Sequence, residues 1–209
     1  MNKHIAIAGI HTDIGKTIVS AVIAEAIGAE YWKPIQAGNL EQSDTIQVSS
    51  LISNGGNRVH KEAVQLTQPL SPHAAAAIDG KSVDYTNFQL PHTDKTLLIE
   101  TAGGLLSPVS DNATVADFIQ HFKLPAILVS KNYLGSINHT LLSIEVMKAR
   151  RIPIIGIIIS GNNNRESEQF IADYTQIPII ARIPYMAPLT AQAISEGATA
   201  IKKSLLQYL

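Results

Sequence analysis

Short apolar runs recur along this chain, and segments with helical spacing separate most of them. The longest run, Ile152 to Ile159, is rich in β-branched residues and does not alternate with polar ones, which is typical of a strand covered on both faces. We expect strands at 4–8, 30–35, 63–66, 96–100, 125–130, 152–159 and 178–183. We expect helices at 18–27, 44–52, 72–77, 114–122, 136–151, 165–174 and, as one or two pieces, 190–209. Strands that alternate with helices favour an α/β fold with a doubly wound, mostly parallel sheet.

Composition narrows the class of protein. A chain of 209 residues suits one domain, so we expect residues 1–209 to form a single unit. Hydrophobic residues make up 45% and charged residues 16%, which argues against disorder. The net charge of −1 indicates no nucleic-acid partner, and the absence of cysteine excludes disulfides and cysteine chemistry. The apolar runs are too short to span a membrane and the start does not read as a signal peptide, so we expect a cytoplasmic protein.

The stretch Gly9–Thr17, with the sequence GIHTDIGKT, joins the first expected strand to the first expected helix. A glycine loop that ends in Gly-Lys-Thr at such a junction is typical of phosphate binding, because backbone N–H groups and the helix N-terminus attract phosphate. Lys16 would reach the outer phosphates and the Thr17 hydroxyl would ligate Mg2+. The first glycine stands one residue earlier than in the standard spacing, so this loop is one residue longer. A plain glycine turn with a solvated lysine is the alternative.

Three charged residues fall where a phosphate and its metal ion would bind. Lys33 stands at the end of the second expected strand, Asp44 in the first turn of a helix, and Glu100 at the end of a buried strand. Because ligands bind at the carboxyl edge of open α/β sheets, Lys33 is a candidate second phosphate-binding lysine. The two acids are candidate Mg2+ ligands. The alternatives are an ordinary edge lysine, an acid that favours the helix dipole, and a carboxylate that only ends its strand.

The helix expected from residue 136 has Gly135 before it and Ser136 as its expected N-cap. A helix N-terminus that follows a glycine can bind an anion. Plain capping by the serine explains the same residues equally well. The pattern therefore leaves an anion site and a cap as alternatives.

Seven short motifs occur in order along nearly the whole chain. They are Thr12–Thr17, Trp32–Pro34, Ser43–Asp44, Ser71–His73, Glu100–Gly104, Leu134–His139 and Ile183–Tyr185. Together they resemble the motifs of dethiobiotin synthetases. The resemblance implies an ATP-dependent ligase with a P-loop fold that converts 7,8-diaminononanoate, CO2 and ATP into dethiobiotin, ADP and phosphate. It also implies Mg2+ as cofactor and a homodimer with the substrate at the subunit interface.

The resemblance also implies roles for individual residues. Lys16, Lys33 and Thr12 would be catalytic, and Thr17, Asp44 and Glu100 would hold the metal ion. The nucleotide would contact Asp13, Ile14, Gly15, Lys16, Thr17, Ile18, Asp44, Glu100, Thr101, Ala102, Gly103, Ser160, Asn162, Pro184, Tyr185 and Met186. The substrate would contact Thr12, Lys33, Ala37, Leu134, Gly135, Ser136, Ile137 and Asn138, with Gly135 to Asn138 contributed by the other subunit.

The chain departs from the family pattern at three positions. Ala37 stands where the family often has serine, Thr101 replaces a glycine, and Ser160 takes the place of an asparagine that would read adenine. Three other functions are alternatives. Amidoligases that make cobyrinate diamides carry a glutaminase domain with a catalytic cysteine, whereas this chain is too short for that domain and has no cysteine. Partition or septum-placing ATPases carry an extra lysine early in the loop, where this chain has Ile10, His11 and Thr12. A silent nucleotide-binding module would not need both lysines and both acids.

Overall fold

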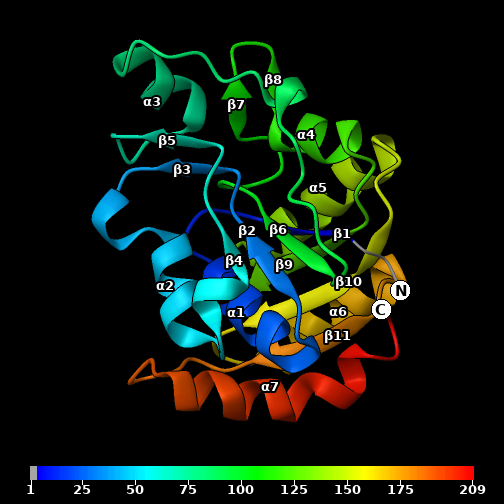
Figure 1. Ribbon diagram of the computed structural model, residues 1–209. Coiled ribbons are helices and arrows are strands. Elements are labelled where there is room, and N and C mark those ends of the chain that lie inside the picture. The colour runs from blue at the N-terminus through cyan, green and yellow to red at the C-terminus, as the bar shows by residue number, and fades with distance from the viewer. Residues whose placement is uncertain (1–3) are drawn as a thin grey trace.

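A parallel sheet forms the centre of the computed structural model, which describes residues 4–209 (Figure 1). Its seven strands follow the order β11-β10-β9-β1-β6-β2-β4, and each neighbouring pair is parallel. The strands are β1 His4–Gly9, β2 Glu30–Trp32, β4 Val59–His60, β6 Leu97–Glu100, β9 Ala126–Lys131, β10 Ile154–Ser160 and β11 Ile179–Ile183. The expected α/β sheet is thus confirmed, and all its carboxyl ends lie at one edge.

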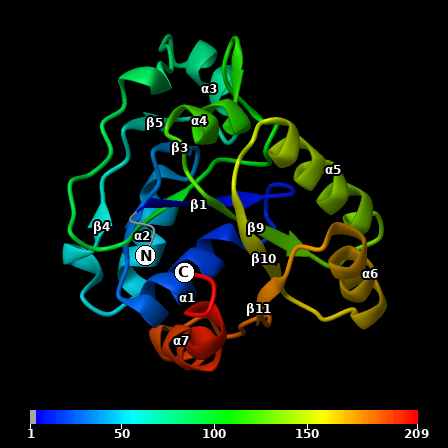
Figure 2. The same cartoon turned by 90° about the vertical axis from the view of Figure 1, so that its right-hand side faces the viewer.

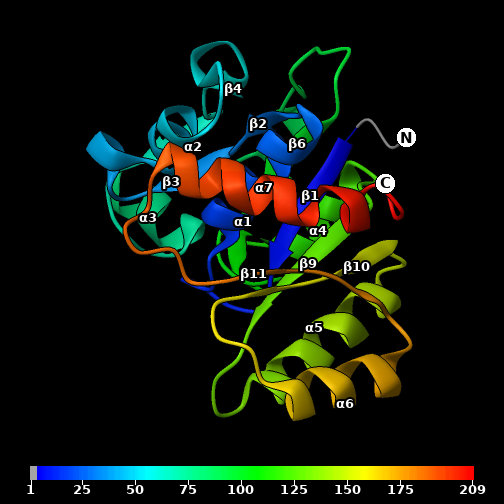
Figure 3. The same ribbon diagram turned by 90° about the horizontal axis from the view of Figure 1, so that it is seen from below.

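Helices cover both faces of the sheet (Figures 2 and 3). One face carries α1 Lys16–Ile27, α2 Asp44–Leu51 and α7 Ala191–Leu205, and the other carries α4 Val115–His121, α5 Ser136–Ala149 and α6 Arg165–Thr175. This cover explains the apolar runs, because the inner strands β1, β6 and β9 are buried on both sides. No helix within residues 4–209 has the length and apolar character needed to cross a membrane.

Smaller elements lie beyond the carboxyl edge of the main sheet (Figure 1). They are the pair β3 Ile35–Ala37 with β5 Val64–Leu66, the hairpin β7 Pro108–Ser110 with β8 Ala113–Thr114, and the helix α3 Pro72–Ile78. Single 3-10 turns occupy Leu40–Gln42, Gly55–Asn57 and Tyr85–Asn87. These elements lie around the carboxyl ends of the main strands, and residues of β3 and of the start of α3 line the cavity at that edge.

Some expected boundaries were wrong. The strand expected over 30–35 ends at Trp32, because Pro34 has no N–H to continue the ladder, and its carbonyl accepts from Ala63 and Val64 instead. The residues after it form β3, in another sheet. Gly135, not Ser136, caps α5, with φ 98°. The strands β4, β7 and β8 were missed because two or three residues carry no detectable periodicity.

Candidate functional site

A cavity of about 830 Å3 opens at the carboxyl ends of β1, β2 and β6. Candidate residues of the glycine loop line it, together with the charged residues that follow the neighbouring strands. Among the residues that line it are Thr12, Asp13, Gly15, Lys16, Thr17, Ile18, Lys33, Ala37, Asp44, Glu100, Ala102 and Gly103. The two lysines and the two acids therefore share one cavity, as the positions of the strand ends predict.

The loop between β1 and α1 is built around its glycines. A Cβ atom at Gly9 would lie 2.9 Å from both Ile14 Cδ1 and Lys16 Cδ, so a side chain there would force the turn open. Gly15 has φ 91°, a conformation that L side chains rarely adopt, and a Cβ there would lie 2.3 Å from Ser160 Oγ. The longer loop thus turns tightly into the N-terminus of α1, where backbone N–H groups are available to a phosphate.

Lys16 is the first residue of α1 and is buried. Its ammonium group donates to the carbonyl oxygen of His11 at 3.1 Å, inside the loop. Burial, and then the nearby charge of Lys33, lower the pKa of Lys16 to about 8, although Glu100 and Asp44 act in the opposite direction. This side chain is held in place by its own loop, and a phosphate at the loop would favour its charged form.

The other charged groups meet around the hydroxyl of Thr17. Thr17 Oγ1 lies 2.9 Å from Asp44 Oδ1 and 3.0 Å from Glu100 Oε1. A hydroxyl has one hydrogen, so it donates to only one of these oxygens at a time. Lys33 Nζ forms ion pairs with Glu100 Oε1 at 3.1 Å and with Asp44 Oδ2. The ammonium group therefore bridges two carboxylates that face each other.

The strand register places these groups. Trp32 of β2 pairs with Ile99 of β6, which brings the next residues, Lys33 and Glu100, side by side at the sheet edge. Asp44 is the first residue of α2 and contacts both Thr17 and Lys33. That helix begins there because the Ser43 hydroxyl accepts from the backbone N–H of Ile46.

Burial and charge act against each other at Lys33. Burial is the largest single effect and favours the neutral amine, but Glu100 and Asp44 together outweigh it and raise the pKa of Lys33. Lys33 is thus an ammonium ion that is paired with two carboxylates. Tyr31 completes the cluster, since its hydroxyl donates to Glu100 Oε2 at 2.9 Å. Burial, and then the charge of Glu100, raise the pKa of the Tyr31 phenol.

The donor set suits a hard divalent cation. Thr17, Asp44 and Glu100 offer only oxygen atoms, which Mg2+ prefers, and Mg2+ commonly takes one or two carboxylates together with phosphate oxygens and water. No group of three or more His, Cys, Asp or Glu side chains suited to a metal ion occurs within residues 4–209. The residues present fit a metal ion that a bound nucleotide helps to hold, and not a metal site made by the protein alone.

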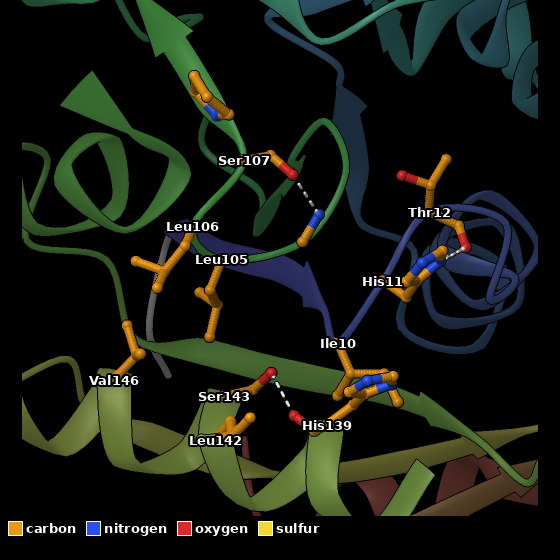
Figure 4. Close-up of a pocket in the computed structure, with 12 residues that line it drawn as sticks. Ile10, His11, Thr12, Leu105, Leu106, Ser107, His139, Leu142, Ser143 and Val146 are labelled. Atoms are coloured by element: carbon orange, nitrogen blue, oxygen red, sulfur yellow. Dashed lines mark hydrogen bonds between the residues drawn. The ribbon is translucent and has the colours of Figure 1, made fainter. Parts of the chain in front are cut away.

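A second cavity, of about 450 Å3, lies next to the first and shares Thr12 and Ser107 with it (Figure 4). Residues from the loop after β1, the loop after β6 and one side of α5 surround it. They are Ile10, His11, Thr12, Gly104, Leu105, Leu106, Ser107, Pro108, His139, Leu142, Ser143 and Val146. The His11 ring stacks on the His139 ring with centroids 6.3 Å apart, which joins the glycine loop to α5. The lining of this cavity is largely apolar, and two of its polar residues, Thr12 and Ser107, are those that it shares with the phosphate cavity.

Other candidate residues lie away from the phosphate cavity. Residues 134, 135, 137 and 138 line a separate hollow of about 810 Å3 together with Asn162, and residues 184–186 line another of about 510 Å3 against α7. Ser136 is buried in the first turn of α5, and its hydroxyl accepts from the N–H of Tyr133. Ser160 packs against Gly15 and pairs with Ile183, so the last strands connect the loop to residues 184–186.

Two of the candidate residues, Thr101 and Ile14, have side chains that are buried in the fold. The buried Thr101 hydroxyl donates to the carbonyl oxygen of Ile7 at 3.1 Å, so it is not directed into the phosphate cavity. Ile14 is buried as well. The sequence reasoning also missed Tyr31, Gln36 and Ser107, which contact or line the site. Their positions carry no signal in the sequence, since tyrosine in a strand and polar residues in loops are ordinary.

Comparison with known proteins identifies close relatives. The family profile described as "AAA domain" matches residues 3–193. ATP-dependent dethiobiotin synthetase BioD of Christiangramia forsetii is 46% identical over 207 residues, which span 99% of this chain and 100% of that relative. The protein of the same name from Rhodopseudomonas palustris strain BisB5 is 42% identical over 194 residues, which span 93% of this chain and 92% of the relative.

Solved structures with a similar fold are more distant. The cell division ATPase MinD of Pyrococcus furiosus matches with a TM-score of 0.59 and 13% identity, covering 100% of both chains. A ParA family ATPase of Chlorobium tepidum matches with a TM-score of 0.55 and 13% identity, covering 99% of this chain and 97% of that one. At this level of identity the likeness concerns the arrangement of the sheet and helices, and not the chemistry.

Proposed function

This chain belongs to the dethiobiotin synthetase family, and we propose that it closes the ureido ring of dethiobiotin from 7,8-diaminononanoate and CO2 at the expense of ATP. The observation that carries this proposal is the convergence of Lys16, Lys33, Asp44 and Glu100 on one cavity beside the glycine loop. We propose further that residues 1–209 act as one domain and that ATP lies with its phosphates in that loop.

The reaction needs no nucleophile from the protein. One amine of the substrate attacks CO2 and loses a proton, which gives a carbamate. A carbamate oxygen then attacks the γ-phosphorus of ATP, ADP leaves, and a carbamic–phosphoric anhydride forms. The second amine attacks the carbonyl carbon, the C–O bond to phosphate breaks, and phosphate leaves as the ring closes with loss of a proton.

The residues act mainly by position and charge. Phosphoryl transfer spreads negative charge over the oxygens of the transferred group, so cations fixed beside it lower the barrier. Lys16 would hold the γ-phosphoryl group from the loop, and Lys33 would hold it, together with the carbamate, from the end of β2. Thr17, Asp44 and Glu100 would hold Mg2+, which when bound neutralises charge on the phosphate oxygens. Thr12, at the boundary of both cavities, would contact the carbamate or an amine.

The apolar cavity beside Thr12 suits the alkyl chain of the substrate. Ile10, Leu105 and Leu142 line its walls (Figure 4), and Thr12 and Ser107 line both this cavity and the phosphate cavity. Burial of the methylene groups there would contribute binding free energy of about 0.8 kcal/mol for each CH2. The diamine end would then face the γ-phosphoryl group while the carboxylate end extends away from it.

A second copy of this chain would supply the contacts for that carboxylate. Leu106, Leu134 and Leu142 are exposed around the apolar cavity and the start of α5, a surface that a partner subunit would cover. In a homodimer the N-terminus of α5 would face the partner's substrate, and its free N–H groups would bind a carboxylate. Ala37, Thr101 and Ser160 differ from the residues that the family pattern has at these positions. Other residues, Asn162 among them, would therefore contact the nucleotide base and the substrate.

Asn138 allows the interface to be tested. Asn138→Ala should raise the KM for the diamine by about tenfold, because a hydrogen bond to a charged group is lost, and should leave the KM for ATP unchanged. Asn163→Ala, an exposed asparagine of the same hollow that no proposed contact uses, is the matched control. Steady-state kinetics with each substrate varied in turn would measure this. A rise in the ATP KM alone would contradict the substrate role.

The proposed activity itself is tested by phosphate release. We expect release from ATP only when 7,8-diaminononanoate and bicarbonate are both present, with one phosphate formed for each dethiobiotin. The same assay with GTP and CTP measures the preference for the base. Release that does not depend on the diamine would contradict the proposed reaction.

A further inference from the structure

Tyr31 is a fully buried residue of β2 that lies directly beside the charged cluster. Its ring belongs to the apolar core, and its hydroxyl donates to Glu100 Oε2 at 2.9 Å. A buried hydroxyl requires a partner, and the partner here is the carboxylate that closes β6. The contact joins two strands across 69 positions of sequence.

The two oxygens of Glu100 have different surroundings. Oε2 accepts from Tyr31 on the core side, whereas Oε1 lies 3.0 Å from Thr17 Oγ1 and 3.1 Å from Lys33 Nζ on the cavity side. A glutamate that is free on both sides can turn its carboxylate about the terminal side-chain torsion, which is broad. With Oε2 tied to the core, the second oxygen is directed at the cavity.

Lys33 follows the same strand that contains Tyr31. The two residues stand two positions apart and contact the same carboxylate, whereas Trp32 between them donates to the carbonyl oxygen of Lys61. One contacts Oε2 and the other contacts Oε1 of the same carboxylate. The phenol is neutral and fixed in the core, whereas the ammonium group lies at the cavity wall.

We propose that Tyr31 is a positioning residue for the metal–nucleotide site. It holds Glu100 with one oxygen presented to the cation, and so removes the cost of ordering that carboxylate when the cation arrives. The proposal rests on the proposed function, in which Glu100 is a metal ligand. Outer groups that orient a ligand in this way commonly change metal affinity by about 10–100-fold.

Tyr31→Phe removes the tie and keeps the ring in the core. In a titration of the protein with Mn2+ in the presence of ADP, followed by electron paramagnetic resonance, the Kd for Mn2+ should rise by about tenfold. Tyr85→Phe is the matched control, because that ring packs against Phe118 and His121 away from the cavity. It should bind Mn2+ as the unchanged protein does.

A double variant distinguishes the positioning role of Tyr31 from the metal-ligand role of Glu100. Glu100→Gln alone should weaken Mn2+ binding, and adding Tyr31→Phe to it should weaken binding no further, because the tie acts through the carboxylate. Wild-type Mn2+ affinity in Tyr31→Phe, with or without a lower Tm, would overturn the positioning role and leave only a structural one. Wild-type affinity in Glu100→Gln would instead overturn the metal assignment on which the proposal rests.

Discussion

Lys33→Ala should lower kcat by about 10²–10³-fold, the loss typical when one fixed group that stabilises charge in a transition state is removed. Lys33 lies at the cavity end of β2, where its ammonium group is the cation closest to Glu100 and Asp44. The KM for ATP should change less, because the loop and Lys16 remain. Single-turnover formation of phosphate from a preformed ternary complex would measure the chemical step directly.

The same variant should lose stability when Mg2+ is absent. Lys33 is paired with two carboxylates, of which Glu100 is almost fully buried, and removing one partner of a buried ion pair costs about 3–5 kcal/mol. Mg2+ with ADP should restore much of the lost stability by supplying the missing charge. Thermal unfolding with and without Mg2+ would measure this, with the exposed Lys202→Ala of α7 as control. Equal turnover in Lys33→Ala and the control would remove Lys33 from the mechanism.

Glu100→Gln should raise the Mg2+ concentration needed for half-maximal ADP binding by about 100-fold, at the upper end of the losses seen around metal sites. The amide keeps the shape of the side chain and can still accept from Tyr31, but it removes the negative charge that attracts the cation. Calorimetric titration of ADP at several Mg2+ concentrations would measure the shift. Glu145→Gln, an exposed residue of α5, provides the control. An unaltered Mg2+ dependence would mean that Glu100 is not a metal ligand.

The fold could be predicted from sequence because its strongest signals are local. The buried strands are long and apolar, and the glycine loop stands between one of them and a helix. The convergence of Lys16, Lys33 and Glu100 also followed from sequence, since residues after neighbouring parallel strands meet at one edge. Asp44 joined them because the first turn of α2 points at the same edge.

The rest depended on contacts that no local pattern encodes. Tyr31 reads as an ordinary strand residue, and its partner lies far along the chain. The apolar cavity is formed by three segments that are distant in sequence, and only the packing of α5 beside the loop at 104–108 creates it. The break at Pro34 was visible in the sequence, yet the pairing of β3 with β5 that follows from it was not.

The fold alone does not choose between functions. A cell division ATPase and a ParA family ATPase align with at least 99% of this chain, but at 13% identity. In this chain a second lysine follows β2 and forms an ion pair with the acid that ends β6. This cluster and the relatives above 40% identity, and not the fold, therefore indicate the function.

The central claim is that two lysines fix a γ-phosphoryl group while a carbamate oxygen attacks it. The transfer of an oxygen atom from CO2 to the released phosphate tests this attack most directly. The substrate diamine and C18O2 are supplied in unlabelled water, and one turnover is quenched before CO2 exchanges its oxygens. We predict that the released phosphate carries one 18O atom from the carbamate. Phosphate without 18O, formed together with dethiobiotin, would contradict the account, because its fourth oxygen would then have come from water.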